Sequence, residues 1–138
     1  MGFDATPFES KTLKDVYFLG PKAPEDLREE IQKATICVFP SFAEAFPLSW
    51  LEAMAMEKAV VASNIGWGTE IINHGVDGFL THPKDHDQFA QYIIELINNT
   101  DLTRQLGKNA RKSAVNKFSH NLVAHQSLEF YKTIIPNA

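Results

Sequence analysis

The sequence has little of three features that mark specialised classes of protein. Its single cysteine, Cys37, cannot form an internal disulfide, and the apolar residues around it predict a buried thiol. Positive charge is not in excess, because 13 Lys and Arg stand against 17 Asp and Glu, so no nucleic acid partner is expected. The sequence also has no signal-peptide pattern and no apolar run of about 18 residues, so we expect a cytoplasmic protein without a membrane span.

What the sequence does have is the composition of a folded chain. Of its 138 residues, 44% are hydrophobic and 22% are charged, and 10 are Phe. A chain of this length fits one compact domain with a hydrophobic core, and two complete domains do not fit. We therefore interpret residues 1–138 as a single domain.

Short apolar runs without polar alternation predict strands that are covered on both faces. Such runs occupy residues 16–19, 36–39 and 59–62, and residues 78–80 form a weaker fourth run. Between the first two runs, Pro24 and the acidic residues after it are typical of a helix start. This strand-helix-strand pattern, repeated along the chain, predicts a parallel sheet.

Helical patterns cover much of the remaining sequence. Residues 48–58 carry apolar side chains at the spacing of one buried stripe. In the C-terminal third, Asp85 and Gln88 form a capping pair that predicts a helix start. A second helix is expected over about residues 101–117, and a third, with an unusually wide apolar stripe, after Ser119 as its cap.

Together these elements predict an α/β fold. We expect a partial doubly wound, Rossmann-like parallel sheet of about three to four strands with flanking helices and an all-helical C-terminal third. Doubly wound sheets typically have about five to six strands. The chain is therefore interpreted as an incomplete domain that corresponds to the later part of such a fold.

Ligands of open parallel sheets bind beyond the carboxyl ends of the strands. The segments that follow the three stronger runs are residues 20–22, 40–44 and 63–69, and we expect all three to share one edge of the sheet. The middle segment ends in Glu44 and leads into the helix predicted from residue 48. Exposed N–H groups at that helix start favour binding of a phosphate.

Glu44 and Glu52 are the candidate ligand-binding acids. If both face the crevice, they flank the helix start, and a carboxylate can hold the vicinal hydroxyls of a ribose. This combination favours a nucleotide ligand. The alternative is that Glu52 is a solvated helix residue and Glu44 an ordinary loop acid.

The ordered motifs resemble the donor-binding signature of retaining glycosyltransferases of the GT-B fold, of the group 1 or family 4 type. That signature has two glutamates separated by seven residues, followed by a strand phrase and a glycine-containing turn before an acid. The resemblance extends over about residues 16–135, which would form a C-terminal, donor-binding domain. The matching segments are residues 38–55, 58–63, 66–70 and 75–80, with Pro83, Phe118 and Ser119.

The resemblance implies a role for each matching residue. Glu44 would be the catalytic residue near the reacting carbon of the transferred sugar, and Glu52 would hold the ribose hydroxyls. The reaction would be transfer of a hexose-type sugar from a nucleotide-diphosphate sugar with retention of configuration, as in polysaccharide or lipopolysaccharide biosynthesis, without a metal or other cofactor. Further donor-binding residues implied by the resemblance are Ser41, Ala45, Phe46, Leu48, Gly20 and Pro21.

The sequence departs from the family pattern in two ways. Pro47 stands where many members have Gly, so an amide contact is lost there and the identity of the sugar is open. The diphosphate-binding Arg and Lys and the N-terminal domain for the sugar or lipid-linked acceptor are absent from these residues. We therefore expect the chain to be a fragment that is inactive alone, and the wide apolar stripe of its last helix could drive self-association.

Other functions of the same fold are alternatives to this prediction. The same fold could serve as a non-catalytic module that binds a nucleotide or a partner protein. A flavodoxin-like receiver or a dinucleotide-binding oxidoreductase is disfavoured, because no paired acids end an initial strand and no Gly-x-Gly-x-x-Gly opens a helix. A sugar phosphorylase or a nucleotide-sugar epimerase on the same architecture stays open, since fold and donor site alone do not fix the reaction. The basic residues Arg104, Lys108, Arg111 and Lys112 fall on one helical stripe, which predicts a solvated face or, as the alternative, peripheral contact with the inner face of a membrane.

Overall fold

The computed structural model describes residues 15–135, and it divides the chain into two compact units, residues 1–30 and 31–138. Helix α1 (Pro24–Lys33) begins in the first unit, at the proline expected to start it, and ends in the second. The strand expected over residues 16–19 is wrong: this segment has no regular structure, and its four apolar side chains are exposed. The sheet of the described residues consists of three other strands, and apolar character alone does not make a strand, which also needs backbone pairing with a neighbour.

The second unit is built on a three-stranded parallel sheet. The strands are β1 (Ile36–Phe39), β2 (Ala59–Ser63) and β3 (Phe79–Thr81), in the order β1-β2-β3. Ile36 lies opposite Ala59 in the first pair of strands. The expected α/β class and parallel sheet are confirmed, with three of the four expected strands formed.

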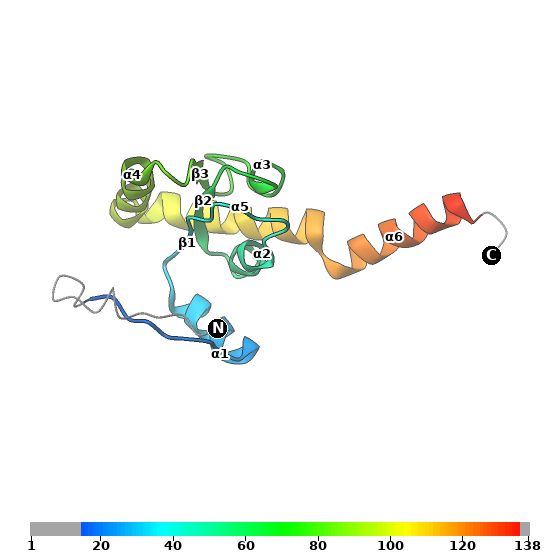
Figure 1. Ribbon diagram of the computed structural model, residues 1–138, viewed down its shortest axis with the longest axis horizontal. Helices are drawn as coiled ribbons and strands as arrows, with labels where there is room; N and C mark the ends of the chain where they lie inside the picture. Colours follow the sequence, from blue (N-terminus) through cyan, green and yellow to red (C-terminus); the bar gives the residue numbers. More distant parts are fainter. Residues whose placement is uncertain (1–14, 136–138) are drawn as a thin grey trace. The chain divides into compact units, whose positions relative to one another are not determined.

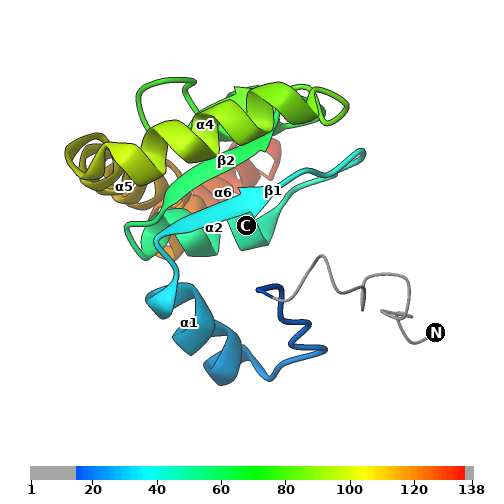
Figure 2. The same ribbon diagram turned by 90° about the vertical axis from the view of Figure 1, so that its left-hand side faces the viewer.

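Five further helices complete the second unit. They are α2 (Leu48–Ala55), α3 (Gly68–Ile71), α4 (His86–Asn98), α5 (Thr100–Phe118) and α6 (His120–Ile134). Figure 2 shows α4 on one side of β2 and α2 on the other, so the sheet is covered on both faces. The C-terminal third is helical, as expected, and α5 and α6 follow one another along the chain (Figure 1).

Helix α2 ends earlier than residue 58, the expected end. Glu57 adopts a left-handed conformation, with φ of 60°, and the Lys58 N–H donates to the carbonyl of Ala53 at 3.1 Å. This is the hydrogen bond of a Schellman-type helix end, which turns the chain toward β2. Periodicity alone does not reveal it, because Glu is not the usual residue at a left-handed position.

The core lies on both faces of the central strand. All five residues of β2 are buried. Val60 and Ala62 pack with residues of α2 and α5, whereas Ala59 and Val61 pack with residues of α4, β3 and α5. Strand β1 is only partly buried, because one of its edges has no neighbouring strand among the described residues.

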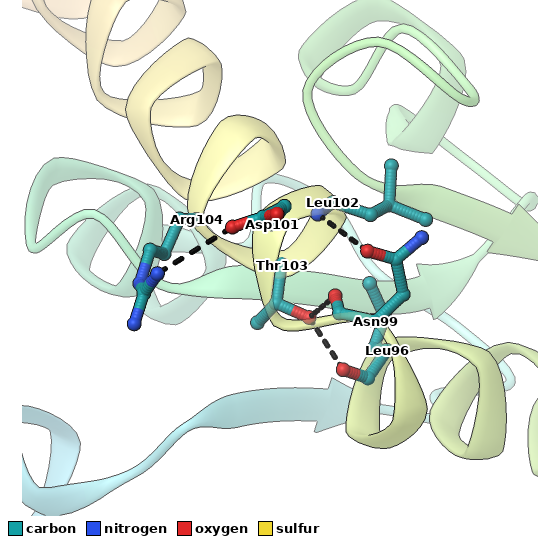
Figure 3. Close-up of polar contacts among 6 residues, drawn as sticks. All are labelled: Leu96, Asn99, Asp101, Leu102, Thr103 and Arg104. Atoms are coloured by element: carbon teal, nitrogen blue, oxygen red, sulfur yellow. Dashed lines mark hydrogen bonds and ion pairs between the residues drawn. The ribbon is translucent and has the colours of Figure 1, made fainter.

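Side chains cap the starts of both α4 and α5. The Asp85 carboxylate accepts from the Gln88 N–H at 3.1 Å and confirms the expected cap. At the junction, Asn99 Oδ1 accepts from the Leu102 N–H at 3.0 Å, and the Thr103 hydroxyl donates to the Asn99 carbonyl at 3.0 Å (Figure 3). The bonds from the Gln88 and Leu102 N–H groups satisfy backbone donors that a helix start leaves open.

Two expectations about single residues are corrected. Ser119 precedes α6, but its side chain makes no capping hydrogen bond, and no residue of α6 is buried. Cys37 is half-buried rather than buried, because it lies on the edge strand β1. Burial raises the pKa of the Cys37 thiol, and the nearby Lys58 ammonium partly opposes this.

Candidate functional site

Glu44 lies in the segment between β1 and α2, at the carboxyl end of the parallel sheet. Its side chain is half-buried. The carboxylate makes no hydrogen bond or ion pair with any other residue that the structure describes. Phe42 and Phe46, on either side of it, are both exposed. A half-buried acid without a partner among the described residues is available to a ligand.

The turn after β2 lies directly against the backbone of Glu44. A Cβ atom added to Gly66 would lie 2.6 Å from the Glu44 carbonyl oxygen, so only a glycine fits there. In addition, the Ser63 hydroxyl at the end of β2 donates to the carbonyl of Phe39 at the end of β1, at 3.2 Å. The segments that follow these two strands are therefore neighbours at one edge, as expected.

The third expected segment contains Gly20 and Pro21. Both residues belong to the first unit and are exposed, and Gly20 has a left-handed φ of 66°. Their assignment to the donor site stays a prediction.

Helix α2 begins directly after the segment that carries Glu44. Pro47 occupies the N-cap position and is buried, and no side chain caps the helix. The Trp50 N–H donates to the Pro47 carbonyl, and the amides of Leu48 and Ser49 come before that first bond. Such N–H groups, at the positive end of the helix dipole, can receive an anion.

Residues near this helix start differ in exposure. Ala45, Phe46 and Leu48 are exposed, and Ser41 is half-buried. The Phe46 ring packs edge-on against Phe118, with ring centroids 6.1 Å apart. The segment that carries Glu44 is thus held on a second side by the end of α5.

Glu52 is exposed on α2 and lines a groove between α2 and the C-terminal end of α5. The groove has a volume of about 330 Å³. Its lining residues are Leu48, Leu51, Glu52, Ala55, Ala114, Val115, Phe118 and Ser119. Glu44 is not among them; it lies next to the turn after β2, whereas Glu52 lies next to α5.

The structure also contains a polar cluster that the sequence did not reveal. Asp77 is 1% exposed, and its carboxylate accepts from the Asn73 N–H at 2.7 Å, the Asn73 amide at 2.8 Å and the Ser113 hydroxyl at 2.6 Å. Beside it, His74 Nδ1 accepts from the Leu80 N–H at 3.0 Å. The cluster ties the turn before β3 to α5. Asn73 and Asp77 are close in sequence, but nothing in the sequence points to Ser113.

Two residues of the basic stripe of α5, Arg104 and Arg111, form ion pairs within the chain. Arg104 pairs with Asp101 at 3.5 Å, and Arg111 pairs with Glu57 at 3.7 Å and donates to the carbonyl of Ala55 at the end of α2. Lys108 is exposed, and peripheral membrane contact by the stripe stays a prediction.

Two other features are absent from the described part of the chain. Among residues 15–135, no group of three or more His, Cys, Asp or Glu is placed to hold a metal ion. Within the same range, no helix has both the length and the apolar character that crossing a membrane requires.

The parallel sheet, its two covered faces and the paired segments at its carboxyl edge define an α/β domain of the Rossmann-like type found in GT-B proteins. The family model described as "Glycosyl transferases group 1" matches residues 9–113. The chain therefore belongs to the group 1 glycosyltransferase family.

Relatives with known names and structures agree with this membership. The chain is 34% identical over 122 residues to the Campylobacter jejuni N,N'-diacetylbacillosaminyl-diphospho-undecaprenol alpha-1,3-N-acetylgalactosaminyltransferase, covering 88% of the chain and 32% of the relative. It is similar in structure to a sucrose-phosphate synthase from Thermosynechococcus elongatus, with a TM-score of 0.86 and 29% identity over 97% of the chain and 33% of that protein.

A third similar protein was solved with ligands. Anabaena Alr3699/HepE in complex with UDP has a TM-score of 0.84 and 30% identity, covering 94% of the chain and 35% of that protein. The same protein in complex with UDP-glucose has a TM-score of 0.81 and 31% identity, over 88% of the chain and 33% of that protein. The chain thus spans about a third of the length of the proteins it matches.

Proposed function

We propose that this chain forms the donor-binding part of a retaining glycosyltransferase, with a nucleotide-diphosphate sugar as its ligand. The observation that carries the proposal is the position of Glu44 at the carboxyl edge of the sheet, in a chain of the group 1 family. Glu44 is half-buried and has no partner among residues 15–135. The complexes of the similar Anabaena protein with UDP and UDP-glucose support a uridine nucleotide as the first ligand to test.

Glu44 would act on the transferred sugar. Its backbone is held by the turn after β2, and its carboxylate is not consumed by any described residue. A carboxylate in such a position stabilises the positive charge that develops at the reacting carbon of a glycosyl donor. Ser41, Ala45 and Phe46 lie in the same segment and would contact the sugar.

The start of α2 would bind the diphosphate. The amides of Leu48 and Ser49 have no side-chain cap, and the helix dipole places about half a positive charge there. Pro47 has no N–H to contribute, so the neighbouring amides carry this contact. Gly20 and Pro21, from the first unit, would border the base.

Glu52 would hold the ribose. It is exposed in the groove beside α2, and each carboxylate oxygen can accept from a sugar hydroxyl. Leu48, one helical turn before it, lines the same groove. A nucleoside in this groove would therefore reach from the ribose at Glu52 toward the diphosphate at the helix start.

The reaction of the whole protein goes beyond this donor site. We propose a hexosyl transfer with retention, without a metal or other cofactor, to a sugar or lipid-linked acceptor in polysaccharide or lipopolysaccharide assembly. The acceptor and the cations that neutralise the diphosphate would come from parts beyond residues 1–138, so this chain alone would bind the donor without transferring the sugar. The setting would be the cytoplasm or the inner face of a membrane.

Calorimetric titration with UDP tests the donor site. The wild-type chain is compared with Glu52→Gln and with Glu95→Gln, which removes an exposed acid from α4 on the opposite side of the sheet. We expect Glu52→Gln to weaken UDP binding about tenfold, because a charged hydrogen bond contributes about 1.5–3 kcal/mol. Glu95→Gln should leave the affinity unchanged.

Two results would contradict the proposal. A wild-type chain that does not bind UDP or UDP-glucose would reject the donor-binding role. Equal affinities of the wild type and Glu52→Gln would reject the assignment of the ribose to Glu52. For the whole protein, the anomeric configuration of the product, measured by NMR, decides between retention and inversion.

A further inference from the structure

Gly66 meets two separate demands at once. Its φ of 55° lies in the left-handed region that side chains disfavour, and a Cβ atom there would lie 2.6 Å from the carbonyl oxygen and 3.7 Å from the carbonyl carbon of Glu44. Atoms in contact prefer a separation of about 3.5–4.0 Å, so the Glu44 backbone would have to retreat by roughly 1 Å to make room. Both atoms that the added Cβ atom would meet belong to Glu44, the candidate catalytic residue.

The other left-handed glycines do not make such a contact. Gly75 has a φ of 76°, and an added Cβ atom would meet nothing within 4 Å. At Gly75 only the turn requires a glycine, whereas at Gly66 the turn and a neighbouring backbone both require it. This difference provides a matched pair of positions for an experiment.

The turn that carries Gly66 is anchored in the core and cannot simply move away. An added Cβ atom at Gly68 would lie 2.5 Å from the carbonyl oxygen of Ser63 and 3.4 Å from the ring of Trp50. Trp50 is fully buried, and the Ser63 hydroxyl donates to Phe39 in the neighbouring strand. A side chain at position 66 would therefore press against the backbone of Glu44.

We propose that Gly66 is a positioning residue that sets the backbone of Glu44, and with it the direction of the Glu44 carboxylate toward the sugar of the donor. The role of Glu44 in this statement rests on the proposed function, whereas the contact between the two backbones does not. A displacement of about 1 Å near reacting groups can lower a rate about 100-fold, so the close approach matters beyond the stability of the turn.

The test compares Gly66→Ala with Gly75→Ala in the ¹⁵N-labelled full chain. Both variants force a side chain into a left-handed conformation, but only Gly66→Ala adds a contact with Glu44. We expect Gly66→Ala to shift the amide NMR signals of residues 43–46, while Gly75→Ala shifts only signals around its own turn. Where Gly66→Ala fails to fold, Gly66→Asn against Gly75→Asn repeats the comparison, because Asn tolerates this conformation better.

Ligand binding supplies a second readout that a loss of stability alone would not move. We expect Gly66→Ala to lower the affinity for UDP-glucose about tenfold more than the affinity for UDP, because in the proposed site Glu44 contacts the sugar. Gly75→Ala should keep the wild-type ratio of the two affinities. Unshifted signals of residues 43–46, or an unchanged ratio in Gly66→Ala, would overturn the proposal.

The two proposals fail in different ways. If the wild-type chain binds neither ligand, the proposed function fails, and the amide signals of residues 43–46 still decide whether Gly66 positions Glu44. If the wild type binds both ligands but Gly66→Ala behaves as Gly75→Ala does, the proposed function stands and the positioning role is rejected.

Discussion

Asp77 and Glu44 are two acids at turns of the same sheet, and they differ in what surrounds the carboxylate. Asp77 is buried, and three donors from Asn73 and Ser113 satisfy it. Glu44 has a backbone that lies against Gly66 and a carboxylate without a described partner. A buried acid with all its hydrogen bonds made stabilises the fold, whereas an acid that is held in place and left open can serve a ligand.

The largest expected effect separates the two acids by stability. Asp77→Ala should lower the free energy of unfolding by about 3 kcal/mol, because hydrogen bonds to a charged group contribute about 1.5–3 kcal/mol and their donors lose a partner. Urea unfolding followed by circular dichroism measures it. Asp87→Ala, at an exposed acid in the first turn of α4, is the control and should cost less than about 1 kcal/mol. Equal losses in both variants would show that the Asp77 cluster does not stabilise the fold.

The next effect separates the acids by binding. Glu44→Gln should leave the free energy of unfolding within about 0.5 kcal/mol of the wild type, because its carboxylate has no described partner to lose. It should remove the preference for UDP-glucose over UDP, which we expect to be about tenfold in the wild type. Titration calorimetry with both ligands measures this preference. A preference that survives in Glu44→Gln would place the sugar elsewhere.

A smaller effect sharpens the description of the Asp77 cluster. Ser113→Ala removes one of its three hydrogen bonds and should cost about 1–2 kcal/mol. In a double-mutant cycle with Asp77→Ala, the two losses should not add, because both variants remove the same bond. Additive losses would mean that Ser113 acts independently of Asp77.

The smallest effect concerns Cys37. Its thiol is half-buried and has no described hydrogen-bond partner, so it combines partial burial with the open surroundings of Glu44. Burial raises the pKa of its thiol, so the thiol stays protonated in the folded chain at a pH where an unfolded chain begins to ionise. The stability from this group is therefore complete below the unfolded pKa and is lost as the pH rises through the higher, folded pKa. Alkylation by iodoacetamide at pH 8 should be slower in the folded chain than in urea; equal rates would contradict this.

The sequence predicted two of the three stronger strand signals and the start of α4 correctly. The strands at residues 36–39 and 59–62 and the Asp85 cap are local signals, and the structure has each of them. The strand expected at residues 16–19 is wrong, because strand formation depends on a neighbour that apolar character does not supply. In doubly wound sheets, strands that are neighbours in sequence are not always neighbours in the sheet, so sequence order does not supply the missing partner.

For the candidate site, the sequence predicted which segments would meet but not the individual contacts between distant residues. The segments after β1 and β2 do meet, as parallel topology requires, and the closeness of Gly66 to Glu44 follows only from the folded backbone. The bond from Ser113 to Asp77 joins residues 36 positions apart, and no local pattern encodes such a contact. The roles of Glu44 and Glu52 toward a donor stay predictions.

The most direct test of the account is an NMR titration of the ¹⁵N-labelled chain with UDP-glucose. The account predicts that the largest shifts fall on the amides of Glu44, Leu48, Ser49 and Glu52, along the segment after β1 and the first turns of α2. Shifts confined to the basic stripe of α5, or no saturable shifts at all, would contradict the claim that this edge of the sheet binds the sugar donor.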